Sequence, residues 1–407
     1  MSTTSAIVTD LPRVSQEALD ALDARVRATR LPRLVPSAAQ APGPGRARQQ
    51  SLLERWRNGF DWRAIEDRVE RLGYAETTTA DGRRLAAIHA RATDPTGLPI
   101  LLVHGWPDSP LRFLELIPLL TAAGHHVVAP AIPGFWRSDE PEGEMSRDIP
   151  AADFHGLMGT LGYDRYAIHA GDWGSPVAQA MAQQHPDAVV ALHLTDVPFD
   201  LAYTIDKGTA GPAEVAYLEA IEKFGENALY LTANTMQPNL VATVLADTPV
   251  GLAAWLGSLY DAWSEQRIAD DHVIANAALM QLTATVRSSM RLYSEPASSW
   301  SEDWGGSDAG EDSWASSAGD EGSWGSSEED ATESAWGDGT GLGLAPVTVP
   351  TAFALFPADL AMAPRELAER HFAVERFTVM PRGGHFAALE EPEPLAEDLL
   401  QFLAGRH

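Results

Sequence analysis

A short polar motif in this sequence has the residue types of a nucleophile held at a sharp turn. Residues 171–174 read Gly-Asp-Trp-Gly, directly after the apolar run 166–170 and before a helical stretch. The small residues Ala170 and Gly174 flank the motif's aspartate, as in a strand-to-helix turn whose tight backbone excludes bulk on either side. An aspartate is anionic at neutral pH, so it attacks carbon without the help of a base and forms an ester. We therefore predict that Asp172 is a nucleophile rather than only a helix cap.

A histidine near the end of the chain is the candidate base. His385 lies in the motif Arg-Gly-Gly-His-Phe at 382–386, after the last predicted strand, and Asp359 lies just past the preceding strand. The order nucleophile, acid, histidine is that of the α/β-hydrolase triad, in which the acid orients the imidazole. No other histidine has a neighbour at metal-ligand spacing, so we expect neither a metal nor an organic cofactor.

A second motif supplies candidate hydrogen-bond donors for an oxyanion. His-Gly-Trp-Pro at 104–107 follows the apolar run 99–103, one strand–helix unit before the nucleophile motif. In this kind of fold the loop after that strand supplies one N–H group, and the residue after the nucleophile supplies the other. We predict the backbone N–H groups of Trp106 and Trp173 in this role.

The elements that position these motifs are predicted from hydrophobic periodicity. Residues 1–73 are predicted to be a helical domain, with a helix capped by Ser15, an aperiodic Pro/Gly-rich connection and a second helix from near Asp61 to Gly73. Residues 74–197 are predicted to be the first part of an α/β core, because short apolar runs alternate with helical stretches after a hairpin signal at Asp81-Gly82. The expected sheet is mostly parallel, with helices on both faces.

The strand–helix alternation is interrupted and then resumes. Residues 198–295 are predicted to form an all-helical lid, with helices at 212–224, 249–263 and 271–293. Residues 345–407 are predicted to complete the core, with strands at 351–356 and 373–380 and a last helix at 392–403. The fold class predicted is therefore an α/β-hydrolase fold with a helical N-terminal domain and a helical lid.

The stretch 296–344 differs from the rest of the chain in composition. Thirteen acidic residues lie between Glu295 and Asp338, and this stretch also carries five of the chain's 12 tryptophans among serines and glycines. Such a composition predicts a solvated, poorly ordered linker. A segment that binds a partner is the alternative, because regularly spaced tryptophans are unusual in a plain linker.

Length, charge and cysteine content exclude several classes of protein. The chain has 407 residues, a formal net charge of −28 and no cysteine. A nucleic-acid binder needs a basic face, which this charge argues against. The absence of cysteine excludes disulfides and fits a reducing compartment. The sequence contains no run of 18 apolar residues, so no membrane span is predicted. A cytoplasmic location is expected.

The sequence resembles the epoxide hydrolases of the microsomal type over nearly the whole chain except 296–343. The resemblance rests on the N-terminal motifs at 27–32 and 56–63 and on His-Gly-Trp-Pro (104–107), Gly-Asp-Trp-Gly-Ser (171–175) and Arg-Gly-Gly-His-Phe (382–386). It implies an epoxide and water as reactants. It also implies that His385 activates water and that an acid orients it, at a position where relatives often have Glu and this chain has Asp359.

The resemblance further implies two lid tyrosines that donate hydrogen bonds to the epoxide oxygen, and these align with Tyr230 and Tyr293. We expect Trp106, Trp136 and Phe386 to contact the substrate. Trp136 is a departure from the family, because relatives usually have a small residue there, and it is expected to narrow the site or reshape access to it.

Two other functions are alternatives to epoxide hydrolysis. A haloalkane or haloacid dehalogenase shares the Asp nucleophile and the histidine step, but needs halide donors such as indole N–H groups. A non-catalytic protein that binds a partner through the stretch 296–344 is the second alternative.

Overall fold

An eight-stranded sheet is the centre of the described structure. The computed structural model describes residues 7–33, 45–295 and 345–406, so the predicted insert 296–344 lies outside the described residues. In spatial order the strands are β1 (Tyr74–Thr78), β2 (Arg84–Ala90), β4 (Val127–Pro130), β3 (Ile100–Val103), β5 (Tyr166–Ala170), β6 (Val189–Leu194), β7 (Val347–Leu355) and β8 (Phe372–Val379).

The sheet has the predicted, mostly parallel arrangement. β1 and β2 form the antiparallel hairpin expected at Asp81-Gly82, and β2 also pairs antiparallel with β4. From β4 through β3, β5, β6 and β7 to β8 every pair is parallel. The carboxyl ends of β3, β5, β6 and β7 therefore lie along one edge of the sheet, and each is followed by a loop that carries a polar motif.

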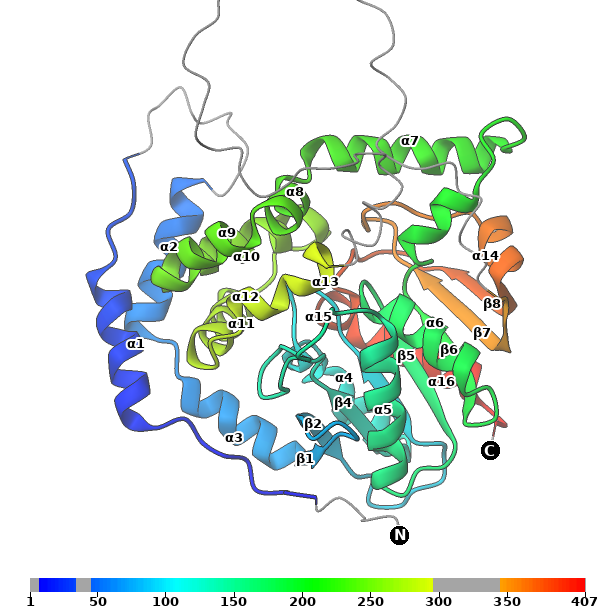
Figure 1. Cartoon of the computed structure of the whole chain (residues 1–407), viewed down its shortest axis with the longest axis horizontal. Coiled ribbons are helices and arrows are strands. Elements are labelled where there is room, and N and C mark those ends of the chain that lie inside the picture. The colour runs from blue at the N-terminus through cyan, green and yellow to red at the C-terminus, as the bar shows by residue number, and fades with distance from the viewer. Residues whose placement is uncertain (1–6, 34–44, 296–344, 407) are drawn as a thin grey trace, which may run out of the picture.

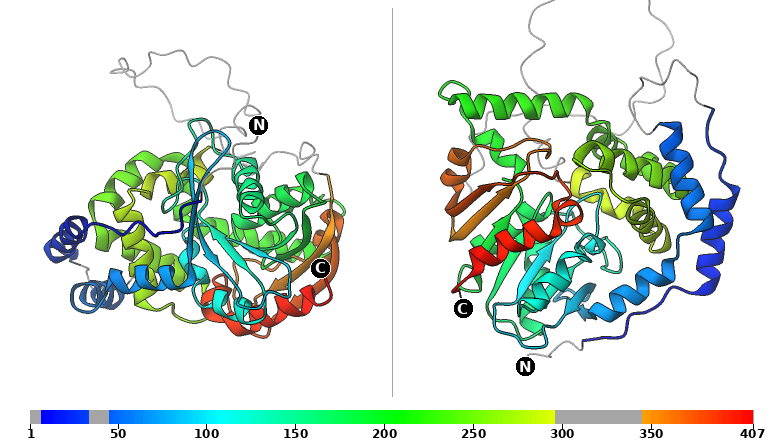
Figure 2. Two further views of the ribbon diagram at one scale, coloured as in Figure 1. Left: turned by 90° about the horizontal axis from the view of Figure 1, so that it is seen from below. Right: turned by 180° about the vertical axis from the view of Figure 1, so that it is seen from behind.

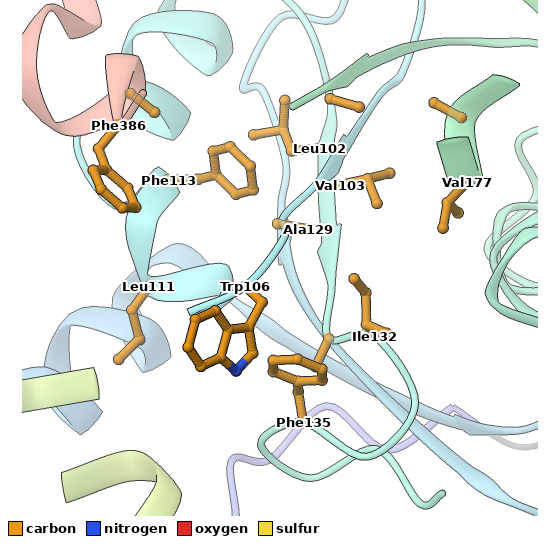
Figure 3. Packing of buried hydrophobic residues seen from close by; sticks show 14 of the residues in the cluster. Leu102, Val103, Trp106, Leu111, Phe113, Ala129, Ile132, Phe135, Val177 and Phe386 are labelled. Carbon is orange, nitrogen blue, oxygen red and sulfur yellow. The ribbon is translucent and has the colours of Figure 1, made fainter. Parts of the chain in front are cut away.

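Helices cover both faces of this sheet, as Figures 1 and 2 show. α5 (Asp148–Thr160) and α6 (Gly174–Gln184) pack together on one face, and α4 (Leu116–Ala122) and α16 (Pro392–Leu403) pack together on the other. Four short elements lie at the rim: η2 (Pro110–Phe113), η3 (Phe199–Thr204), α14 (Arg365–His371) and α15 (Ala387–Glu390). Figure 3 shows part of the buried cluster around β3, with Trp106, Phe113 and Phe386 among its members.

The N-terminal part contains three helices in the described residues, one more than predicted. α1 (Gln16–Ala28) is capped by Ser15 and α3 (Trp62–Leu72) by Asp61, as predicted. α2 (Arg46–Asn58) was not predicted, because its sequence is largely polar. Its few apolar side chains are nevertheless buried against the lid and α1, so tertiary packing rather than local periodicity stabilises it.

The helical lid contains α7 (Pro212–Asn227), α8 (Leu229–Met236), α9 (Pro238–Asp247), α10 (Pro249–Trp263), α11 (Asp270–Leu282), α12 (Val286–Ser289) and α13 (Arg291–Ser294). The predicted single helix 271–293 is wrong: α11, α12 and α13 replace it. Ala284 has a left-handed backbone (φ 56°), which ends α11, and the Thr283 hydroxyl donates to the Leu279 carbonyl at the break. This break turns the chain so that Tyr293 reaches the site described below.

The N-terminal helices hold the lid from outside. Arg48 of α2 is buried and forms ion pairs with Asp261 of α10 and Asp270 of α11. Arg55, which lies further along the same helix α2, pairs with Asp271. No single helix among the described residues is long and apolar enough to cross a bilayer, although α9 and α10, bent by 119° to each other, pass that test together.

Candidate active site

Asp172 lies at a strained turn between β5 and α6. Its backbone is left-handed (φ 57°), a conformation that costs energy for any residue other than glycine and is found mainly at functional sites. The turn passes close to β3: a Cβ atom on Gly174 would lie 2.5 Å from the Val103 carbonyl oxygen. The small residue predicted at this position is therefore a packing requirement.

The Asp172 carboxylate is held between the two predicted motifs. Its Oδ1 atom accepts a hydrogen bond from the Trp106 backbone N–H at 2.8 Å, and its Oδ2 atom lies 3.2 Å from His385 Nε2. A Cβ atom on Gly105 would lie 2.1 Å from Oδ1, so only glycine leaves room for the carboxylate here. The structure thus brings the 104–107, 171–174 and 382–386 motifs together.

His385 bridges the nucleophile and the predicted acid. Its Nδ1 atom lies 2.7 Å from Asp359 Oδ1, on the side of the ring opposite Asp172. Burial alone lowers the pKa of His385, but the charge of Asp359 and the hydrogen bonds to Asp172 and Asp359 outweigh burial and raise this pKa to about 10. The imidazole is therefore protonated at neutral pH.

The two predicted tyrosines converge on the nucleophile from the lid. Tyr230 of α8 stacks on Trp106 with ring centroids 5.3 Å apart, and Tyr293 of α13 meets Trp106 and Trp173 edge-on at 5.4 and 5.3 Å. Burial and the nearby Asp172 charge raise the pKa of Tyr230, although a hydrogen bond with Tyr293 opposes the shift. Burial likewise raises the pKa of Tyr293. Both hydroxyls therefore stay protonated and can donate.

The predicted oxyanion donors occupy different positions around Asp172. The Trp106 N–H already donates to the Asp172 carboxylate. Trp173 is the residue that precedes the first turn of α6, where backbone N–H groups have no acceptor within the helix. The role of Trp173 as an oxyanion donor stays a prediction, and its indole ring, which contacts Tyr293, lines the site.

Two residues predicted to contact the substrate pack against other aromatic side chains. Trp136 packs edge-on against Tyr74 of β1, with centroids 5.6 Å apart. Phe386 is fully buried and lies 4.4 Å from the Tyr260 ring and 6.1 Å from Trp263. Phe386 therefore supports the histidine loop from within the core, and a substrate contact for either side chain stays a prediction.

Sequence reasoning missed two residues of the site. Trp263, the last residue of α10, contacts the His385 ring at 5.4 Å and the Tyr230 ring at 4.9 Å, and its carbonyl accepts the His385 backbone N–H at 2.8 Å. Asp196, after β6, accepts a hydrogen bond from the Asp172 N–H. A signal for Asp196 existed, because a carboxylate directly after a strand of a parallel sheet lies at the same edge as the other loop motifs.

The described residues contain no group of three or more His, Cys, Asp or Glu side chains that could hold a metal ion. The chemistry the arrangement can carry out rests on the carboxylate, the imidazole and the two phenols.

Comparison with known proteins identifies the relatives of the chain. Residues 11–113 match the epoxide hydrolase N-terminus family, and residues 99–254 match the α/β hydrolase fold family. A Stigmatella aurantiaca protein assigned provisionally to the epoxide hydrolases is 31% identical over 95% of this chain and 82% of its own length. Epoxide hydrolase 1 of Sus scrofa is 27% identical over 87% of this chain and 79% of its own.

Solved structures show the same fold. The juvenile hormone epoxide hydrolase of Bombyx mori superposes with a TM-score of 0.78 at 24% identity, covering 98% of this chain and 94% of that one. The Aspergillus niger epoxide hydrolase gives a TM-score of 0.76 at 23% identity, covering 98% and 96%.

Proposed function

Because this chain belongs to the epoxide hydrolases of the microsomal type, we propose that it opens its epoxide through a covalent ester on Asp172 that water activated by His385 then hydrolyses. The observation that carries the proposal is the Asp172 carboxylate, which Trp106 and His385 position where its charge acts on Tyr230 and Tyr293.

In the first half-reaction Asp172 attacks an epoxide carbon. The C–O bond of the ring breaks and an ester bond forms, so the negative charge moves from the carboxylate to the epoxide oxygen. The Tyr230 and Tyr293 hydroxyls meet this charge from the lid, in an aromatic surrounding where hydrogen bonds to a developing oxyanion have a large effect. The alkoxide takes a proton from one of these two hydroxyls, and the product is a hydroxyalkyl ester of Asp172.

Ester formation changes the basicity of His385. Two carboxylates hold its proton in the resting enzyme, and the ester removes the charge of one of them. The pKa of His385 then falls, because only Asp359 still opposes the cost of burying the cation. His385 therefore releases its proton, which replaces the one that the tyrosine gave to the alkoxide, and the neutral imidazole can act as a base in the next step.

In the second half-reaction His385 takes a proton from water, and the resulting hydroxide attacks the ester carbonyl carbon. The backbone N–H groups of Trp106 and Trp173 would hold the tetrahedral oxyanion, after which the diol leaves and the Asp172 carboxylate is restored. Asp359 keeps the imidazole in the orientation and tautomer that this step requires.

Replacing His385 by Gln tests the two-step scheme. Asp172 needs no base to attack, so the variant should form the ester but not hydrolyse it. Intact-protein mass spectrometry after incubation with an epoxide that the wild-type enzyme turns over should show the added mass of one substrate. The peptide that contains Asp172 should carry this mass. An inactive variant that never gains this mass would mean that His385 acts before or during ring opening and that the ester scheme is wrong.

A further inference from the structure

The loop after β6 places a third carboxylate beneath the nucleophile. Asp196 is 7% exposed. Its Oδ2 atom accepts the Asp172 backbone N–H at 2.5 Å, and its Oδ1 atom accepts the Ser175 hydroxyl. β6 lies between β5, which leads to Asp172, and β7, which leads to Asp359, so this side chain sits between the strands that carry the nucleophile and the acid.

These two hydrogen bonds span the strained turn. Asp172 has the left-handed backbone, and Ser175 lies three residues later in the first turn of α6. A single carboxylate that binds a backbone group at residue 172 and a side chain at residue 175 ties the two ends of the turn together. A left-handed non-glycine residue persists only where its surroundings fix it, and Asp196 supplies polar contacts on both sides.

We propose that Asp196 is a positioning residue of the enzyme, which clamps the strained nucleophile turn through the Asp172 N–H and the Ser175 hydroxyl and sets the rate of ester formation on Asp172. This inference rests on the proposed covalent mechanism and adds a residue to it. Asp196 touches no reacting atom, so it acts through the position and the charge environment of Asp172.

The charge of Asp196 gives the clamp a second effect. Burial and the neighbouring Asp359 raise the pKa of Asp196 to about 7, while the hydrogen bonds from Ser175 and Asp172 and the charge of His385 oppose this rise. Tyr217 of α7 also faces Asp196 and Asp359, and burial raises its pKa, so it is neutral. An ionised Asp196 next to Asp172 favours the loss of the Asp172 charge, which is what ester formation accomplishes.

The test measures the rate of ester formation in the His385→Gln background, by mass spectrometry over time and between pH 5.5 and 8.5 with a substrate epoxide. Asp196→Ala should slow mass gain about tenfold or more, because the turn loses both contacts. Asp196→Asn should restore the rate to within about threefold at low pH, because its oxygen can accept from Asp172 and its amide can donate to Ser175.

The pH profile separates positioning from mere structural support. In the His385→Gln parent the rate should rise as Asp196 ionises, at a pH above about 7 because the His385 charge that lowers the Asp196 pKa has been removed, and in Asp196→Asn this rise should be absent. Asp153→Asn is the control: it removes a part-buried carboxylate of α5 that pairs with Arg83, and it should leave the rate and the pH profile unchanged.

Each outcome decides between distinct claims. If the parent gains mass and both Asp196 variants match it in rate and pH profile, the clamp is wrong and the covalent mechanism stands. If the parent itself never gains mass, the covalent mechanism is wrong and the clamp is overturned with it. If Asp196→Ala fails to fold, Asp196→Asn and Ser175→Ala decide: an unchanged rate and pH profile in both would overturn the proposal.

Discussion

The two sides of the active site are built by different forces. The floor consists of Asp172, His385 and Asp359, which loops at the edge of the sheet hold by hydrogen bonds of 2.7 to 3.2 Å. The roof consists of Tyr230, Tyr293 and Trp263, which lid helices hold by ring contacts between 4.9 and 5.8 Å. Directional hydrogen bonds and charges fix the floor, and aromatic packing fixes the roof.

This difference separates the chemistry into two tasks. In the proposed mechanism the floor forms and hydrolyses a bond to carbon, which demands narrow geometry and a definite protonation state. In the proposed mechanism the roof donates hydrogen bonds to the epoxide oxygen, and two hydroxyls share this task. Changes to the floor should therefore abolish steps, whereas changes to the roof should reduce rates.

Removing the nucleophile should have the largest effect. We expect Asp172→Ala to lose about 10⁴-fold or more of its diol-forming activity, because the covalent step has no other carboxylate in line with it. The fold should persist, and near-ultraviolet circular dichroism checks this. A folded Asp172→Ala protein with wild-type turnover would contradict the division between floor and roof.

Replacing the two tyrosines of the roof should have the next largest effect on activity. We expect the double variant Tyr230→Phe/Tyr293→Phe to lose about 10²–10³-fold in the rate of ring opening, with each single variant less affected because the other hydroxyl remains. Single-turnover kinetics on an epoxide and a chlorinated analogue measure this. Full epoxide activity of the double variant would mean that the tyrosine assignment is wrong, and turnover of the chlorinated analogue would favour a dehalogenase.

Trp263 links floor and roof, so its replacement should have an intermediate effect. Trp263→Leu keeps the carbonyl that binds the His385 N–H but removes the ring that contacts His385 and Tyr230. We expect a loss of about tenfold in kcat/KM from poorer positioning. Trp255→Leu on the same helix is the control and should change stability more than rate.

The smallest effect should be on stability against pH. The folded state raises the pKa of His385 to about 10, so its contribution to stability is complete below pH 6.5 and is lost as the pH rises toward 10. The Tm of the wild-type protein should therefore fall over this interval more than that of His385→Gln. Melting curves of both proteins at each pH measure this. An equal fall of Tm in the two proteins would mean that the inferred charge pairing of His385 is absent.

The floor could be predicted from the sequence because each of its residues stands in a local motif after a buried strand, and parallel strands bring such motifs to one edge. The role of Trp263 could not be predicted from the sequence, because its contact with His385 depends on how α10 ends against a loop far along the chain. The lid was predicted as helical, but α8 and α9 were missed and 271–293 was joined into one helix. Local periodicity carries no signal for the reversal at Ala284, which the tertiary fold imposes.

The ion pairs of buried Arg48 with Asp261 and Asp270 tie α2 to two helices of the lid. A lid that swung away as one body would expose a guanidinium and separate it from two carboxylates, and breaking such buried pairs costs several kcal/mol. We expect substrate and product to pass through local movements of side chains and short helices, while α10 and α11 remain in place. We therefore expect the lid to stay in place during turnover and bulky diols to leave more slowly than small ones.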